Sequence, residues 1–200
     1  EIKKVLVVGA GTMGSGIAQV LAAGGYEVAL HDLNDEFVRK GMAAIEKNLQ
    51  ASVAKGKLTD AEKSAIVARI MPTTLLEPAR ECQLVIEAII EKKEAKMALF
   101  HDLDALCPPE AILASNTSSI PITELATSNK RPEKFVGMHF FNPVPVMKLV
   151  EIIKGLKTAD QTAQVIKGIT EHIGKVGVFV KDGPGFLVNR INAALRSEVY

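Results

Sequence analysis

The most constraining feature of the sequence is a strand, a glycine-rich loop and a helix that follow one another directly. Residues 5–8 (VLVV) form a continuous apolar run, which is typical of a strand buried on both faces. Glycines follow at positions 9, 11 and 14, and apolar residues then recur at helical spacing as far as residue 24. A strand that passes through such a loop into a helix predicts the first unit of a parallel α/β sheet.

The rest of the chain repeats this alternation of strand and helix patterns. Further strands are expected at 28–30, 84–87, 112–115, 135–139, 149–153 and 176–180. Helices are expected at 35–55, from a capping box at 59–62, at 91–106 and at 159–173. Strands 135–139 and 149–153 are joined by the turn NPVPVM, which is too short for a helical crossover, so they should be antiparallel. The pattern predicts a Rossmann-type, doubly wound α/β fold, mostly parallel with antiparallel edge strands.

The end of the chain departs from this alternation. Residues 182–185 (DGPG) break the pattern, and 186–200 form a new helical pattern. Its apolar stripe consists of Leu187, Ile191, Leu195 and Val199. The stripe either packs on another chain or belongs to a missing domain, and we favour the second explanation. We therefore expect a Rossmann domain over 1–183 and, over 184–200, the first helix of a C-terminal helical domain that is otherwise absent.

Charge and composition exclude several classes of function. The 24 Lys and Arg residues balance 23 acidic residues, so the net charge of +1 predicts no nucleic-acid or membrane partner. The sequence has neither a signal-peptide layout nor an apolar run of about 20 residues. Cys82 and Cys107 fit no metal-binding or CxxC spacing, which indicates reduced, structural cysteines and no metal. We expect a soluble, cytoplasmic protein.

The glycine loop and the end of the second strand predict a dinucleotide site. Gly9 permits a tight turn, Gly11 lets backbone approach a pyrophosphate, and Gly14 lets the helix pack on the strand. Asp32 ends the second strand, where a carboxylate accepts hydrogen bonds from both ribose hydroxyls and repels a 2′-phosphate. NAD is therefore preferred over NADP, with a flavin as the weaker alternative. Asp32 alone could also be an ordinary strand-end residue or helix cap.

His139 is the first candidate for proton transfer, because it ends an apolar strand where ligands bind in doubly wound sheets. Glu151 is the one charged side chain of the segment LVEII, and a carboxylate buried there needs a partner. Antiparallel pairing would bring it beside His139, where it would orient the imidazole and raise its basicity. The competing interpretations are a structural histidine and a salt bridge from Glu151 to Lys148 or Lys154.

The remaining polar candidates carry weaker signals. Residues 115–119 (SNTSS) end another strand and are either an ordinary Ser/Thr turn or a group that orients a substrate hydroxyl. His101 and His172 lie in polar helical stretches and are expected on the surface. His31 stands beside the strand-end carboxylate and is better explained by packing.

Taken together, the motifs identify a family resemblance. GAGTMGSGIAQ, LVIEA-x-x-E, LASNTSS, GMHFFNPVPVMKLVE and PGFLVNR occur in this order and spacing. The sequence resembles 3-hydroxyacyl-CoA dehydrogenases over essentially its whole length, and most of all their short-chain members, which act on 3-hydroxybutyryl-CoA. The resemblance implies the Rossmann fold, NAD as cofactor, an acyl-CoA substrate and an (S)-3-hydroxyacyl-CoA to 3-oxoacyl-CoA reaction in fatty-acid or butyrate metabolism.

The resemblance also implies roles for individual residues. His139 would be the general base that takes the 3-hydroxyl proton, and Glu151 its carboxylate partner. Ser118 and Asn189 would hydrogen-bond the oxygen functions of the substrate. The matching nicotinamide-ribose contacts are Glu91, Lys96, Ser118 and Asn142. The adenosine and pyrophosphate end would be contacted by Met13 and Asp32, with Ile89 and Ile90 at backbone-contact positions.

Two further implications concern the periphery of the site. Lys55 matches a lysine near the CoA phosphates, although a cation also suits a helix C-terminus without any ligand. The family's C-terminal helical domain, which makes the homodimer and closes over the site, is absent after Tyr200.

Three other functions compete with this one. A non-catalytic NAD-binding relative would have lost part of the set formed by His139, Glu151, Ser118 and Asn189, all of which are present. A dehydrogenase of free hydroxy acids would lack the HFFNP segment. The dehydrogenase part of a multifunctional fatty-acid oxidation protein stays open, although a glycine loop that begins at residue 9 favours a stand-alone enzyme.

Overall fold

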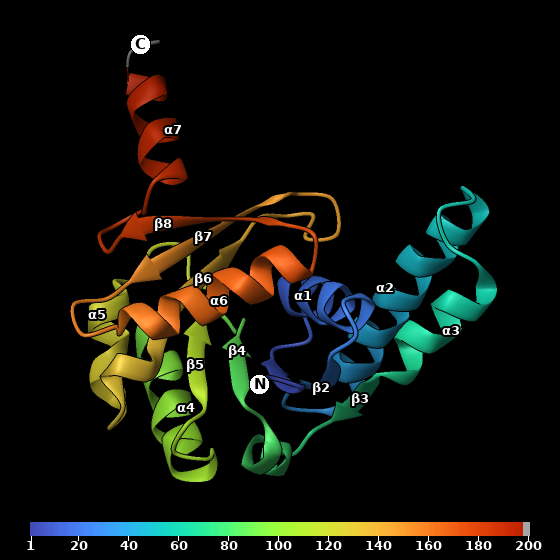
Figure 1. Cartoon of the computed structure of the whole chain (residues 1–200), viewed down its shortest axis with the longest axis horizontal. Helices are drawn as coiled ribbons and strands as arrows, with labels where there is room; N and C mark the ends of the chain where they lie inside the picture. Colours follow the sequence, from blue (N-terminus) through green and yellow to red (C-terminus); the bar gives the residue numbers. More distant parts are fainter. Residues whose placement is uncertain (198–200) are drawn as a thin grey trace.

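The computed structural model describes residues 1–197 and has one eight-stranded sheet at its centre, in the order β3-β2-β1-β4-β5-β6-β7-β8 (Figure 1). The strands are β1 (Lys4–Val8), β2 (Glu27–His31), β3 (Ile70–Thr73), β4 (Leu84–Glu87), β5 (Ile112–Ser115), β6 (Phe135–Phe140), β7 (Leu149–Lys154) and β8 (Val176–Lys181). The helices are α1 (Thr12–Ala23), α2 (Asp35–Ala54), α3 (Asp60–Ala68), α4 (Lys93–Leu106), α5 (Ile122–Leu125), α6 (Asp160–His172) and α7 (Val188–Ser197). Short 3-10 turns stand at Glu77–Glu81, Ala126–Ser128 and Pro132–Lys134.

Helices cover both faces of the sheet, so residues 5–8 of the central strand β1 are apolar on both faces. Val5 and Val7 of β1 point into one core with α1, α2, α3 and α6. Leu6 and Val8 alternate with them and point into a second core with α4 and α5. All four side chains are at most 2% exposed. This two-sided burial confirms the doubly wound α/β fold that the strand patterns predict.

The register confirms the predicted antiparallel pair at β6 and β7. Neighbouring strands from β3 to β6 are parallel, whereas β7 runs against β6 and is itself parallel to β8. His139 stands directly opposite Glu151 in this pair. The topology therefore puts both residues of the expected proton-transfer pair at one place in the sheet.

The sequence patterns miss one edge strand and misplace one helix end. Strand β3 is short and contains Pro72, a residue that argues against a strand except at the edge of a sheet, where β3 lies. Helix α4 begins at Lys93 and not at residue 91, so Glu91 lies in the loop after β4. The predicted capping box of Thr59 and Glu62 does open α3.

Close packing accounts for two of the glycines in the first loop. Gly9 has a φ of 107°, and a Cβ atom there would lie 2.5 Å from the carbonyl oxygen of Ala88. A Cβ atom on Gly14 would lie 1.6 Å from the carbonyl oxygen of Gly9. Gly11 differs, because a Cβ atom there would meet nothing within 4 Å. Helix α1 therefore packs directly against the glycine loop at Gly14, whereas the space beside Gly11 is free.

Helix α7 projects away from the rest of the molecule (Figure 1). Leu187 is 43% exposed, Ile191 49% and Leu195 61%, so the described part of the predicted apolar stripe is uncovered. Val199 lies outside the described residues. The turn before α7 contains Phe186, which is buried. Helix α7 is therefore joined to the core through this turn.

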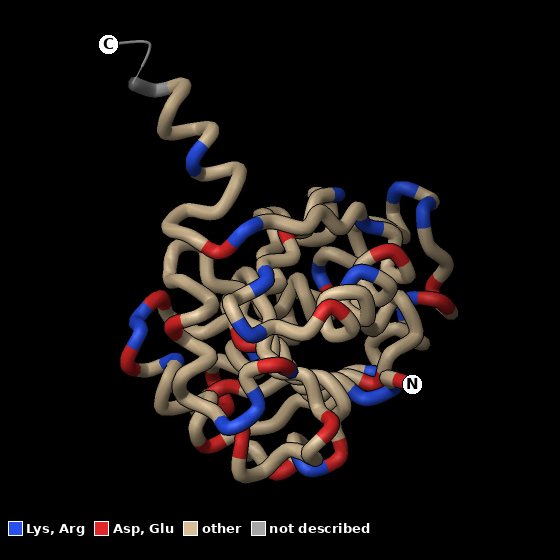
Figure 2. Tube along the Cα trace, turned by 60° about the vertical axis from the view of Figure 1, so that its left-hand side comes forward, with Lys and Arg blue, Asp and Glu red and all other residues tan. Residues whose placement is uncertain are grey.

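Acidic and basic residues are interspersed along the Cα trace (Figure 2), in keeping with the net charge of +1. Among the helices that the structure describes, none combines the length and the apolar character needed to cross a membrane. The described residues also hold no cluster of three or more His, Cys, Asp or Glu side chains that could bind a metal ion.

Gly14→Ala should destabilise the protein because its methyl group would overlap the Gly9 carbonyl oxygen, 1.6 Å away. We expect the free energy of unfolding, measured by urea denaturation, to fall by at least about 1–3 kcal/mol, the usual cost of overpacking. Gly11→Ala is the matched control and should lose less than about 1 kcal/mol, since Gly11 stands at the N-cap of α1 with open space beside it. Equal losses in the two variants would contradict this packing.

Candidate active site

The polar candidates gather at one edge of the sheet because the parallel strands end there. The glycine loop follows β1, residues 88–92 follow β4, residues 116–121 follow β5 and residues 141–148 follow β6. Ligands of doubly wound sheets bind beyond the carboxyl ends of the strands, in the crevice between diverging connections. The loops thus bring residues from distant parts of the sequence to one edge.

His139 and Glu151 form a buried, hydrogen-bonded pair at this edge. His139 Nδ1 lies 2.7 Å from Glu151 Oε2, and the two residues are 6% and 1% exposed. The proposed rim salt bridges are wrong, because Lys154 pairs with Asp160 and Lys148 Nζ reaches the Gly174 carbonyl oxygen at 3.4 Å. The pairing inferred from strand register is therefore present.

Hydrogen bonds keep the buried Glu151 carboxyl ionised. Burial by itself would raise the pKa of Glu151, but the hydrogen bond from His139, the N–H groups of Val188 and Leu187 and the charge of the imidazole lower it below its usual value. An ionised Glu151 accepts a hydrogen bond from Nδ1–H of His139. The lone pair of the neutral imidazole is then on Nε2, the atom that can take up a proton.

Aromatic rings enclose the imidazole of His139. The ring centroids of Phe141 and Phe186 lie 4.6 Å and 5.8 Å from its own. Phe141 follows β6, whereas Phe186 comes from the turn before α7. These rings limit the positions that the imidazole can adopt.

Ser118 and Asn189 meet although they lie on different elements. Asn189 Nδ2 donates to the carbonyl oxygen of Ser118 at 3.3 Å, and the backbone N–H of Ser118 donates to Glu91 Oε1 at 3.0 Å. Asn189 stands in the first turn of α7, whose neighbours Leu187 and Val188 contact Glu151. The loop after β5 and the start of α7 therefore both border the His139–Glu151 pair, which we call the dyad.

The segment 115–119 is a turn held by an acidic residue. Glu91 accepts hydrogen bonds from the Thr117 hydroxyl, from the Ser118 N–H and from the Ser119 hydroxyl. Burial would raise the pKa of Glu91, but the Thr117 bond, the charge of Lys96 and the Ser118 bond outweigh it, so this pKa is lowered. Glu91 thus ties the loop after β4 to the loop after β5.

A second buried ion pair, Glu87 with Lys96, underlies these loops and was not predicted. Glu87 is fully buried and Lys96 is 1% exposed, with Lys96 Nζ 2.5 Å from Glu87 Oε1. Glu87 also accepts from the Ser115 hydroxyl at 2.6 Å and the Ile89 N–H at 2.8 Å. Lys96 Nζ further lies 3.2 Å from Glu91 Oε2. The buried pair therefore helps to hold the Glu91 carboxylate in place through Lys96.

A signal for Glu87 was available in the sequence. It is the one charged residue of its buried strand, LVIE, as Glu151 is of LVEII. A buried carboxylate of this kind needs donors, so the rule applied to Glu151 predicts a site at Glu87 as well. The sequence pattern does not indicate its cation, because Lys96 is the fourth residue of α4 and only the packing of that helix turns it inward.

The residues around the glycine loop fit a dinucleotide. Asp32 Oδ2 accepts the N–H of Ala10 at 2.7 Å, which puts the strand-end carboxylate beside the loop. Helix α1 has no side-chain cap at Gly11 and no acidic residue in its first turn, so its N-terminal N–H groups are open to an anion. Gly11 has free space beside it, so the protein backbone can approach a pyrophosphate there. Met13 packs against the core. These features suit the pyrophosphate and adenosine ribose of NAD.

Four predicted residues lie at the margin of this arrangement. The Ile89 N–H is engaged by Glu87, whereas Ile90 is 62% exposed. Asn142 is exposed in the loop after β6. Lys55 is exposed at the C-cap of α2 and is not joined to the dyad or the loops.

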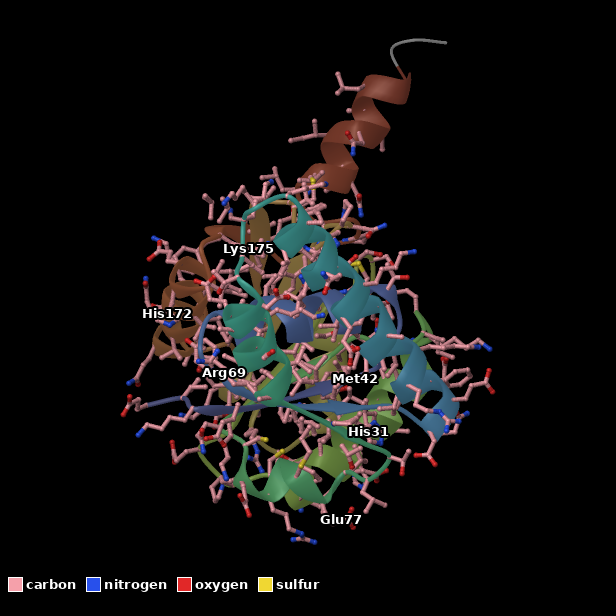
Figure 3. The ribbon with its side chains drawn as sticks, turned by 90° about the vertical axis from the view of Figure 1, so that its right-hand side faces the viewer. His31, Met42, Arg69, Glu77, His172 and Lys175 are labelled. Atoms are coloured by element: carbon pink, nitrogen blue, oxygen red, sulfur yellow. The ribbon has the colours of Figure 1, made fainter. Side chains whose placement is uncertain are left out.

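The other histidines lie away from the dyad, as expected. His101 is exposed on α4, and His172 is exposed on α6, at the outer edge of the molecule in Figure 3. His31 is 5% exposed at the end of β2, where burial lowers its pKa. Of the four histidines, His139 is the one paired with a carboxylate.

A glycine loop beside a strand-end carboxylate and a buried His–Glu pair at the same sheet edge define a dinucleotide-dependent dehydrogenase domain. Comparison with known proteins specifies the family. Residues 4–183 match the model of the 3-hydroxyacyl-CoA dehydrogenase NAD binding domain. The chain therefore belongs to the 3-hydroxyacyl-CoA dehydrogenase family.

Individual relatives agree with this assignment. The chain is 49% identical over 191 residues to the probable 3-hydroxybutyryl-CoA dehydrogenase of Bacillus subtilis, covering 96% of this chain and 67% of that protein. It is 42% identical to the fatty acid oxidation complex subunit alpha of Idiomarina loihiensis, covering 96% of this chain but 27% of the relative. The crystal structure of (S)-3-hydroxybutyryl-CoA dehydrogenase from Ralstonia eutropha superposes with a TM-score of 0.97 at 43% identity, over 99% of this chain and 70% of that one.

The comparisons confirm the resemblance inferred from the motifs. With it they confirm the Rossmann-type fold, NAD as the cofactor and the class of NAD-dependent 3-hydroxyacyl-CoA dehydrogenases. A non-catalytic NAD-binding protein is not supported. The chain spans about two thirds of the length of the B. subtilis relative.

Lys96→Met should strongly destabilise the protein, because it leaves the buried Glu87 carboxylate without its cation. Removing one partner of a buried ion pair costs about 3–5 kcal/mol, measurable by urea denaturation. The double variant Lys96→Met/Glu87→Gln is the control and should recover most of this loss, since the charge is removed as well. A double variant no more stable than the single one would refute the pairing.

Proposed function

We propose that this protein interconverts (S)-3-hydroxyacyl-CoA and 3-oxoacyl-CoA with NAD(H), and that 3-hydroxybutyryl-CoA is its substrate. The observation that carries the proposal is the buried His139–Glu151 pair at the ligand-binding edge of the sheet, 2.7 Å between Nδ1 and Oε2. The names of the B. subtilis and R. eutropha relatives support the short acyl chain.

The proton is handled by residues of this chain. When bound, NAD supplies the hydride acceptor, and NADH the hydride donor. His139 Nε2 takes the proton of the 3-hydroxyl group in the oxidation and returns it in the reduction. The ionised Glu151 stabilises the imidazolium that forms and holds the ring through Nδ1. Ser118 and Asn189, which touch each other beside the dyad, orient the substrate oxygens.

We assign the cofactor to the glycine loop and the three loops beside it. Gly9, Gly11, Met13, Gly14 and Asp32 hold the adenosine and pyrophosphate end. The nicotinamide end is held by Glu91, Lys96, Ser118 and Asn142, and Ile89 and Ile90 contact the cofactor through their backbone. The network that joins Lys96 to Glu91 and Glu91 to Ser118 supports this second assignment.

The periphery of the site completes the proposal. Residues 184–200 begin a second, helical domain, supported by the exposed apolar stripe of α7, and this domain makes a homodimer. Lys55 contacts the CoA phosphates, supported by its exposed position at the end of α2. The protein works in the cytoplasm.

A second candidate function is the dehydrogenase part of a multifunctional fatty-acid oxidation protein. Its support is the 42% identity to a fatty acid oxidation complex subunit alpha, of which this chain covers 27%. An assay of NADH oxidation across 3-oxoacyl-CoA chain lengths distinguishes the substrate ranges. Sharp preference for the four-carbon substrate supports the first proposal, whereas equal rates across chain lengths would count against it.

His139→Ala should abolish most turnover, because general acid–base catalysis contributes about 10²–10⁴-fold. We expect that loss in acetoacetyl-CoA-dependent NADH oxidation, with little change in NAD affinity by titration calorimetry. His101→Ala, at an exposed histidine of α4, is the control and should keep normal turnover. Unchanged turnover in His139→Ala would refute the proposed mechanism.

Asp32 should make the protein prefer NADH to NADPH. A 2′-phosphate about 4 Å from this carboxylate would cost about 1–4 kcal/mol for each pair of unit charges, or about 5-fold to 10³-fold in kcat/KM. Asp32→Asn should narrow the preference, whereas Asp35→Asn, a nearby exposed carboxylate in the first turn of α2, should not. Equal kcat/KM for the two cofactors in the unaltered protein would exclude this role.

A further inference from the structure

The carboxylate of Glu151 has a second set of partners besides His139. Its Oε2 atom lies against His139 Nδ1, whereas Oε1 accepts the backbone N–H groups of Leu187 at 3.1 Å and Val188 at 2.8 Å. These two N–H groups are the start of α7, which begins at Val188. One buried carboxylate therefore joins the dyad to the first turn of α7.

The turn that delivers these N–H groups has an unusual backbone. Phe186 has a φ of 49° and is the one non-glycine residue with positive φ within residues 1–197. It follows Gly185, whose φ is 75°. A left-handed non-glycine residue of this kind costs about 1–3 kcal/mol and persists where its surroundings hold it. Its ring is 2% exposed and packs 5.8 Å from the ring of His139, centroid to centroid.

The other end of the turn is fixed to α5. Asp182 accepts hydrogen bonds from the N–H of Ile122 at 2.8 Å, the N–H of Thr123 at 2.7 Å and the hydroxyl of Thr123 at 2.5 Å. The chain is thus held at Asp182, turns through two left-handed residues and reaches Glu151 at Leu187. The placement of α7 and that of Glu151 cannot change independently.

We propose that residues 185–188 are a positioning element for the proton-transfer pair: the N–H groups of Leu187 and Val188 hold Glu151, and the Phe186 ring holds the His139 imidazole. This inference rests on the proposed function, in which His139 transfers the proton. It adds that a displacement of α7 would move the Glu151 carboxylate and the Phe186 ring. The orientation of α7 therefore determines whether the His139 imidazole is correctly placed for proton transfer.

Electrostatics gives the element a measurable effect. Within the described residues, burial raises the pKa of Glu151, while His139 and the N–H groups of Val188 and Leu187 lower it. Among the residues that the structure describes, His139 is the one charged group that shifts this pKa: β8 places Val178 opposite Glu151, Asp182 is bonded to α5, and Arg190 is exposed on α7. Loss of one N–H donor should therefore raise the pKa of Glu151 and leave Oε1 less firmly held.

Val188→Pro tests the proposal because proline removes the backbone N–H group that donates to Glu151. Proline is well tolerated at the first position of a helix. The preceding residue, Leu187, accepts the first helical hydrogen bond, from the Ile191 N–H, and so stands at the N-cap, where the extended backbone favoured before proline is usual. Val188→Ala is the matched control, since it also loses the valine side chain but keeps the donor.

Two measurements on the purified protein decide the outcome. Carboxyl ¹³C NMR should show Glu151 titrating at higher pH in Val188→Pro than in Val188→Ala. Turnover with acetoacetyl-CoA and NADH should fall about 10-fold or more in the proline variant relative to the alanine variant, with KM nearly unchanged, because a hydrogen bond to a charged group is lost. A titration and a kcat that match those of Val188→Ala would overturn the proposal.

The NMR titration separates this inference from the proposed function. If the unaltered protein does not turn over acetoacetyl-CoA but Val188→Pro shifts the Glu151 titration, the proposed function fails while the contact of the turn with the dyad stands. If turnover falls without a shifted titration, α7 acts through packing alone and the N–H role is wrong.

A second variant covers the case in which Val188→Pro does not fold. Phe186→Leu keeps every N–H group and an apolar side chain, but removes the ring beside His139. We expect displaced imidazole proton resonances of His139 and a kcat reduced several-fold, with the Glu151 titration unchanged. Imidazole resonances identical to those of the unaltered protein would overturn the role of Phe186.

Discussion

The central constraint in this molecule is the cost of burying a carboxylate. Glu151 is 1% exposed, and a buried charge is tolerated where donors surround it. Its donors come from β6, which carries His139, and from the first turn of α7, and their positions follow from that requirement. Three features together supply hydrogen-bond donors to the buried Glu151 carboxylate: the orientation of the imidazole, the antiparallel register of β6 and β7, and the attachment of α7.

The same constraint shapes the cofactor side of the site. Glu87 is fully buried below the loops after β4 and β5, and Lys96 crosses from α4 to neutralise it. The chain of contacts continues from Lys96 to Glu91 and from Glu91 to the residues after β5. A buried ion pair is seldom a source of net stability. Its value here is geometric, because it holds in place the loops after β4 and β5, to which we assign the nicotinamide end of NAD.

Local patterns predicted most of the fold and much of the site. Continuous apolar strands indicated a sheet covered on both faces, and a short Pro-containing turn indicated the antiparallel pair that aligns His139 with Glu151. Strand β3 escaped prediction because Pro72 and partly exposed side chains give a short edge strand no clear pattern. Glu87 is a lone charge in an apolar strand, as Glu151 is, but its partner Lys96 is turned toward the sheet by helix packing and not by sequence spacing.

The sequence by itself determined the order of strands and helices, the glycine loop, the strand-end Asp32 and the isolated charge in each of two apolar strands. These features depend on neighbours within a few residues, where periodicity and backbone preference operate. The short turn already indicated His139 as a partner of Glu151, whereas the tertiary structure alone decided the other partners of the buried charges: Lys96 for Glu87, and the start of α7 for Glu151. Such partners are 9 to 37 residues apart along the chain. Only the packing of α4 on the sheet and the path of the turn before α7 bring them within hydrogen-bonding distance.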